Sequence, residues 1–127
     1  MKKLILTLAL TGLVFAQTLC AQTYDRGEVI KVMRQNVTLL NGVKADLGAS
    51  KLTDAADKFY QFAKGQSSIL IYTPPKGTKT EWDRINGAFV TAALKGVASS
   101  LANDKIKAQA ALDELLALNK EGHGTFR

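Results

Sequence analysis

Apolar residues recur at steps of three and four along most of the chain after residue 24, which is the spacing of helices that bury one face. The first such stretch begins after Asp25, a good N-cap, and ends at Gly48. Gly42 interrupts this helix and indicates a close contact with a neighbouring helix. The stripe, in which Asn36 is the one polar residue, consists of Val29, Val32, Met33, Asn36, Val37, Leu40, Val43 and Leu47.

A second helix is predicted to start after Ser50, which we expect to be its N-cap, and to weaken near Gly65. Its buried positions would be Leu52, Ala55, Ala56, Phe59, Phe62 and Ala63. The run 67–72 is β-prone, but one short strand has no evident partner in this chain. We therefore expect an extended apolar segment or a last, distorted helical turn. The paired prolines of the segment 73–77 indicate a linker, because proline ends a helix and fixes an extended path.

A third helix is predicted to begin near Thr80, and a fourth to follow Asn103, its expected N-cap. The third helix would bury Trp82, Ile85, Phe89, Ala92, Ala93, Gly96, Val97 and Leu101. The fourth would bury Ile106, Ala108, Ala111, Leu112, Leu115, Leu118, Gly122 and Phe126. The short joints at 48–50 and 102–103 favour antiparallel neighbours. The sequence thus predicts an all-α fold, an antiparallel up-down-up-down four-helix bundle.

Residues 1–21 have the pattern of a secretory signal peptide. Lys2 and Lys3 precede an apolar run over 4–16, and small and polar residues surround Ala21. The run is shorter than the roughly 20 apolar residues that span a bilayer, so we expect cleavage rather than a retained membrane anchor. The predicted mature domain is then residues 22–127, located in the periplasm.

Cleavage would also remove Cys20, the only cysteine. The mature domain could then contain no disulfide, thiolate zinc site, iron–sulfur cluster or cysteine nucleophile. The chain has 17 Lys and Arg residues against 11 Asp and Glu residues. Without Lys2 and Lys3 the balance is 15 against 11, a net charge of +4 that is spread along the chain. We therefore expect no nucleic-acid partner.

The sequence contains few of the motifs that are typical of enzymes. It has no Gly-rich phosphate loop, no HExxH motif and a single histidine. Its acidic residues fall mostly on the polar faces of the predicted helices, and a ferritin-like di-metal site would need Glu-x-x-His pairs on two helices. We therefore expect no enzymatic activity and assign no catalytic residue.

Two residues stand apart as candidate metal ligands, Met33 and His123. If the first and fourth helices are antiparallel neighbours, Met33 lies about 12 Å from the start of one, and His123 about 6 Å from the end of the other. A thioether and an imidazole would then face each other at one end of the core, as the axial ligands of a six-coordinate haem do. Gly122 and Gly124, which bracket the histidine, would leave open backbone where a flat macrocycle could approach. Taken alone, a methionine in a core stripe usually fills a gap, and a histidine near a chain end is usually solvated.

The segment 101–115, followed by His123-Gly-Thr-Phe-Arg127, resembles the last helix of the periplasmic cytochrome b562 family, which ends in His-x-x-aromatic-Arg. The linker Thr73-Pro-Pro-Lys76 resembles the central loop of that family, and the first helix can be laid on its counterpart so that Met33 falls on the axial methionine. The resemblance implies one non-covalent b-type haem, held between Met33 and His123.

The related cytochrome c prime family shares the bundle and the same ending. Its Cys-x-x-Cys-His would fall on Asn119-Lys-Glu-Gly122-His123, where both cysteines are missing, so covalent haem attachment is excluded. The run 29–35 also resembles the start of the c prime first helix, an alignment that would give Arg34 a place near the haem edge and remove Met33 from the ligand role. The chain could therefore be a b-type cytochrome or a c prime-like protein that has lost its cysteines and its haem.

By this resemblance we expect a non-catalytic electron carrier, monomeric or weakly dimeric, with unidentified redox partner proteins and no membrane contact after signal cleavage. Arg34 and Arg127 could pair with the haem propionates. The expected apolar wall consists of Val37, Phe89, Leu116 and Phe126. The alternative is a haem-free helical bundle that acts as a periplasmic binding or stress-adaptor protein, and its core would be packed shut at the Met33 and His123 end. Peroxidase chemistry at an opened ligand site is a third and more distant alternative.

Overall fold

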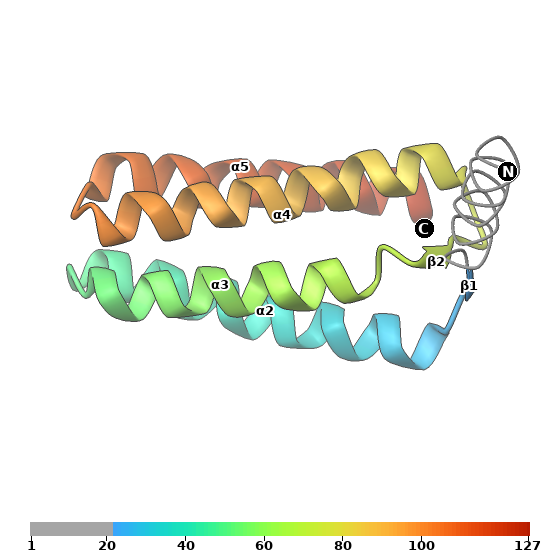
Figure 1. The fold of residues 1–127 in the computed structure, drawn as a ribbon, viewed down its shortest axis with the longest axis horizontal. Helices are drawn as coiled ribbons and strands as arrows, with labels where there is room; N and C mark the ends of the chain where they lie inside the picture. The colour runs from blue at the N-terminus through green and yellow to red at the C-terminus, as the bar shows by residue number, and fades with distance from the viewer. Residues whose placement is uncertain (1–21) are drawn as a thin grey trace, which may run out of the picture.

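The computed structural model describes residues 22–127, which form four helices that pack against one another (Figure 1). The prediction of an all-α four-helix bundle is confirmed. The predicted signal peptide, residues 1–21, lies outside the described residues. The elements in chain order are β1 (Gln22–Thr23), α2 (Arg26–Gly48), α3 (Leu52–Ser68), β2 (Tyr72–Thr73), α4 (Lys79–Leu101) and α5 (Lys105–Phe126).

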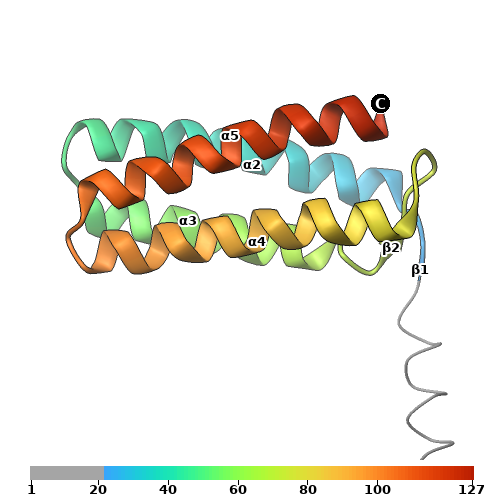
Figure 2. The same cartoon turned by 90° about the horizontal axis from the view of Figure 1, so that it is seen from above.

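The turns between α2 and α3 and between α4 and α5 lie at one end of the bundle. The longer connection from α3 to α4 lies at the other end, together with β1 and the end of α5 (Figures 1 and 2). Helix α3 packs on α2 and α4, and α4 packs on α5, whereas α2 and α5 touch much less. The seam between α2 and α5 is therefore the loosest side of the bundle.

Three of the four helices begin with a side-chain cap. Asp25 accepts a hydrogen bond from the Glu28 N–H at 3.0 Å, as predicted, and Thr78 and Asp104 play the same part for α4 and α5. The N-cap of α3 is Lys51, whose side chain makes no capping hydrogen bond.

The predictions that Ser50 and Asn103 are N-caps are wrong. Both residues adopt left-handed backbone conformations, with φ of 56° and 57°. Each follows the last turn of a helix, and the next N–H returns to a carbonyl of that turn: Lys51 N to Asp46 O, and Asp104 N to Ser99 O. This is the Schellman arrangement, so both residues end a helix instead of starting one.

The core follows the predicted stripes with a shift on α2. Leu39 is buried there, whereas Met33 is 38% exposed and Val37 is 59% exposed. Leu101 and Ile106, predicted to be buried, are exposed beside the α4–α5 turn. Small residues bring helices together: a Cβ on Gly96 would lie 2.5 Å from the ring of buried Phe59, and one on Gly42 would lie 2.7 Å from Lys58 Cδ.

The apolar run after α3 does have a partner, contrary to expectation. Tyr72 and Thr73 pair in parallel with Gln22 and Thr23, so the first described residues tie the α3–α4 connection to the start of α2. Tyr24 then packs edge-on against Tyr72 and Trp82, with ring centroids 6.4 and 6.0 Å apart. This partner strand, Gln22–Thr23, lies directly after the predicted cleavage site, and the periodic pattern of the chain gives no sign of it.

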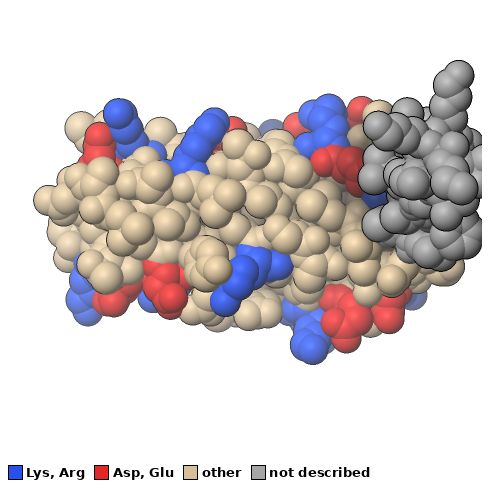
Figure 3. All heavy atoms as spheres, viewed as in Figure 1, with Lys and Arg blue, Asp and Glu red and all other residues tan. Residues whose placement is uncertain are grey.

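Charges of both signs are interspersed on the face drawn in Figure 3. Over residues 22–127 many charges are paired, as in Lys58–Asp46 at 2.5 Å, Lys79–Asp83 at 2.7 Å and Lys95–Glu114 at 3.4 Å. The cationic excess therefore forms no single-sign patch on this face.

Candidate functional site

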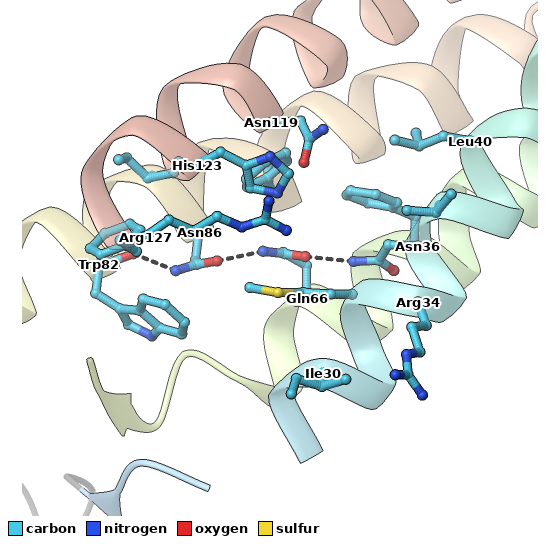
Figure 4. A pocket seen from close by; sticks show the side chains of 17 residues that line it. Ile30, Arg34, Asn36, Leu40, Gln66, Trp82, Asn86, Asn119, His123 and Arg127 are labelled. Atoms are coloured by element: carbon cyan, nitrogen blue, oxygen red, sulfur yellow. Dashed lines mark hydrogen bonds between the residues drawn. The ribbon is translucent and has the colours of Figure 1, made fainter. Parts of the chain in front are cut away.

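A cavity of about 290 Å³ lies between the four helices, toward the end of the bundle that holds the end of α5 (Figure 4). This volume falls at the lower edge of the roughly 300–1,000 Å³ typical of small-molecule sites. Its walls are mainly aliphatic and aromatic. The apolar lining residues are Ile30, Met33, Val37, Leu40, Phe62, Trp82, Ile85, Phe89 and Phe126.

Met33 from α2 and His123 from α5 both line this cavity. The sequence placed these two residues at the same end of the core, and the structure brings them to the same space. Met33 keeps 38% of its surface exposed, so it borders the cavity without being packed into the core. A flexible thioether at such a place can turn toward a bound group without disturbing the core.

The imidazole of His123 lines the cavity and has a lowered pKa. Burial lowers its pKa below the usual value, and the nearby positive charge of Arg127 lowers it further. The imidazole is therefore neutral at neutral pH, which is the form that binds a metal.

Several contacts fix the last turn of α5, which carries His123. The Phe126 ring packs edge-on against Trp82, with ring centroids 5.1 Å apart, and lies directly against Gly77 of the α3–α4 connection. Lys76 donates a hydrogen bond to the main-chain carbonyl of Arg127. Arg84 of α4 pairs with Glu121, one turn before the end of the helix. The linker predicted from the paired prolines thus holds one side of the site in place.

Part of the predicted wall is present. Val37, Phe89 and Phe126 line the cavity, whereas Leu116 does not and is 47% exposed. The prediction for Leu116 is wrong because its position on α5 faces solvent. The analysis of apolar spacing missed Phe62, Trp82 and Ile85 as wall residues, since a stripe shows that a residue is buried but not that it borders a cavity.

The two predicted arginines behave differently. Both line the cavity, but in Figure 4 the Arg127 side chain reaches inward beside His123, whereas Arg34 extends away from the other labelled side chains. No Asp or Glu lines the cavity, and neither arginine forms an ion pair among residues 22–127. The charged side chains that line the cavity are therefore all cationic.

Three buried amides cross the cavity in a row that the sequence did not reveal. Asn36 of α2 bonds Gln66 of α3 at 2.7 Å, Gln66 bonds Asn86 of α4, and Asn86 bonds the Trp82 carbonyl at 2.8 Å (Figure 4). We call Asn36, Gln66 and Asn86 the amide row. The one signal for it was Asn36, the polar residue in an apolar stripe.

The chemistry available here is the binding of a group by one thioether and one neutral imidazole inside an apolar enclosure. Residues 22–127 contain no cluster of three His, Cys, Asp or Glu side chains that could hold a bare metal ion. A haem iron needs only two protein ligands, because the porphyrin supplies the other four. The donor set and the lining therefore fit a haem.

Within the described part of the chain, no helix is long and apolar enough to cross a membrane. Comparison with known proteins gives no relative: no family model, no curated protein and no solved structure matches this chain.

Proposed function

We propose that this protein is a periplasmic electron-transfer protein that binds one non-covalent b-type haem between Met33 and His123. The observation that carries the proposal is the cavity that both side chains line, one from α2 and one from α5. We further propose that the four helices form an antiparallel up-down-up-down bundle, so that the start of α2 lies beside the end of α5. The alternation of the connections between the two ends of the bundle supports this arrangement (Figure 1).

When bound, a haem would supply a reversible one-electron couple at its iron. The residues of the chain would supply the ligands of the iron and its apolar surroundings. His123, held neutral by burial, provides a nitrogen ligand, and Met33 provides a soft sulfur ligand from the opposite helix. Phe62 and Phe89, with ring centroids 5.8 Å apart, form an apolar wall that restricts water. These are the features by which proteins tune a haem potential.

If Met33 and His123 both held a haem iron, no position at that iron would be left for a substrate, which is why we propose electron transfer and not catalysis. Asn119 and Gly122 occupy the places where a Cys-x-x-Cys motif would attach the haem covalently, and both border the cavity. The competing interpretation, a haem-free adaptor bundle, requires that this end of the core be packed shut. The cavity of about 290 Å³ favours the haem protein.

Titration with hemin tests the proposal, because Trp82 is the only tryptophan and lines the cavity. We expect hemin to quench its fluorescence with an endpoint of one equivalent, and His123→Ala to weaken binding strongly. Leu116→Ala is the matched control, since Leu116 lies on the same helix outside the cavity. Unquenched fluorescence at excess hemin would contradict the proposal.

A further inference from the structure

The amide row contains three of the four buried polar residues of the described chain. The exposed fractions of Asn36, Gln66 and Asn86 are 7%, 5% and 4%, and all three side chains line the cavity. The row links α2, α3 and α4 at one level, opposite His123 of α5 and Arg127, which follows the end of that helix (Figure 4). The axial ligation proposed above uses none of these three residues.

The orientation of every amide in the row follows from its last partner. The Trp82 carbonyl can only accept, so Asn86 must turn its NH₂ group toward it. The oxygen of Asn86 then faces Gln66, which must donate, and the oxygen of Gln66 faces Asn36, which must donate in turn. Flipping any one amide would set two oxygens or two NH₂ groups against each other.

This orientation leaves one spare donor on each amide, while each engaged oxygen keeps a second lone pair. The oxygens of Gln66 and Asn86 are both engaged within the row. The Asn36 oxygen has no hydrogen-bond partner, but it lies beside the Gly65 backbone, 3.5 Å from where a Cβ on Gly65 would be. Each NH₂ group has two hydrogens and uses one, so one N–H per amide remains available.

The charged side chains of the cavity also supply hydrogen-bond donors. Arg127 reaches toward the row, its guanidinium can only donate, and no carboxylate lines the space (Figure 4). A ligand that fills this cavity therefore gains most if it combines an apolar body with acceptor oxygens directed at the amide row. Buried donors that meet no acceptor are costly, so the row discriminates against a ligand that lacks such oxygens.

We propose that the amide row is a carboxylate-binding subsite, through which the cavity recognises an apolar ligand that bears carboxylate groups. The subsite shares the cavity of the proposed function, but it needs no iron. Spare N–H groups of Gln66 and Asn86 hold the carboxylate oxygen atoms, and the Arg127 guanidinium balances their charge.

The probe is metal-free protoporphyrin IX, compared with its dimethyl ester, which has the same macrocycle and no free carboxylate. Binding is followed by quenching of Trp82 fluorescence. We expect the wild-type protein to bind the acid about tenfold or more tightly than the ester, since hydrogen bonds to charged groups are the strong ones. Gln66→Met should reduce this acid-to-ester preference severalfold. Gln61→Met, on the same helix but outside the cavity, should leave the preference unchanged.

A merely structural role for the row predicts that Gln66→Met weakens acid and ester equally, and that result would overturn the proposal. Equal binding of acid and ester by the wild-type protein would overturn it as well. If Gln66→Met fails to fold, the isosteric Gln66→Glu decides: its carboxylate should repel the acid and spare the ester, and an unchanged preference counts against the subsite. Binding of hemin without binding of either porphyrin contradicts the subsite and leaves the haem proposal standing. The reverse result contradicts only the haem proposal.

Discussion

Gly77 lies against the ring of Phe126: a Cβ on this glycine would be 3.0 Å from Phe126 Cε1, and the glycine adopts a φ of 83°. The contact joins the α3–α4 connection to the last turn of α5, which carries His123 on the wall of the cavity. Both the space and the backbone conformation require glycine at this position.

We therefore expect Gly77→Ala to destabilise the fold by about 1–2 kcal/mol, the usual cost of a left-handed non-glycine residue, and to weaken hemin binding by displacing the last turn of α5. Urea denaturation and hemin titration measure the two effects. Gly124→Ala is the control, because it lies in that last turn and its Cβ would meet nothing within 4 Å. A fully stable Gly77→Ala protein would show that the contact does not hold the site.

Gly96 and Phe59 form a close approach between α3 and α4. A Cβ on Gly96 would be 2.5 Å from the buried ring, so Gly96→Ala must push the two helices apart. We expect a loss of about 1–3 kcal/mol in the free energy of unfolding, the usual cost of overpacking a core.

Gly87→Ala, on the same helix as Gly96, should raise the free energy of unfolding. Nothing lies within 4 Å of its Cβ position, so removal of a mid-helix glycine should stabilise the protein by about 0.5–1 kcal/mol. Equal effects of the two alanines in urea denaturation would disprove the packing argument.

Ser50 ends α2 in a left-handed conformation that glycine adopts without strain. We expect Ser50→Gly to raise the free energy of unfolding by about 1 kcal/mol, which corresponds to a rise of about 4–8 °C in Tm for a domain of this size. Its hydroxyl accepts a hydrogen bond from Lys105 at 3.2 Å, but that bond is exposed and contributes little. A drop in Tm by calorimetry would refute the assignment of Ser50 as a helix end.

The pKa of His123 is lower in the folded protein than its ordinary value of 6.5. Above pH 6.5 the imidazole is neutral in both the folded and unfolded states, and it contributes no pH dependence. As the pH falls through 6.5 the unfolded state takes up the proton first, so stability declines until the folded pKa is passed.

His123→Gln should therefore flatten the stability curve between pH 6.5 and the folded pKa. Urea denaturation at a series of pH values tests this. Hemin affinity should fall only as the pH drops through the folded pKa itself, because there a proton competes with iron for the imidazole. A slope that is unchanged in His123→Gln would assign the pH dependence to another group.

Much of the fold could be predicted from the chain itself. The helices lie where three-and-four spacing placed them, because burial of an apolar face dominates their formation. Ser50 and Asn103 were misassigned because the residues that favour an N-cap also tolerate the left-handed conformation that ends a helix. The β1–β2 pairing was missed because the paired residues, such as Gln22 and Tyr72, are 50 positions apart in the chain and each strand is only two residues long.

The candidate site was predictable only in part. Met33 and His123 could be placed at one end of the bundle by counting residues along two helices. The amide row could not, because Gln66 and Asn86 are polar residues of ordinary helices until three helices bring them together. The inward turn of Arg127 likewise depends on side-chain packing that no spacing encodes.

The central claim is that Met33 and His123 together ligate a haem iron. The most direct measurement is the absorption spectrum of the hemin-loaded protein, oxidised and reduced, for the wild type, Met33→Ala and His123→Ala. We predict a sharp Soret band and split visible bands on reduction for the wild type, an altered ligation spectrum for Met33→Ala and loss of these bands for His123→Ala. A folded helical protein that stays colourless with excess hemin, or whose spectrum neither substitution changes, would contradict the account.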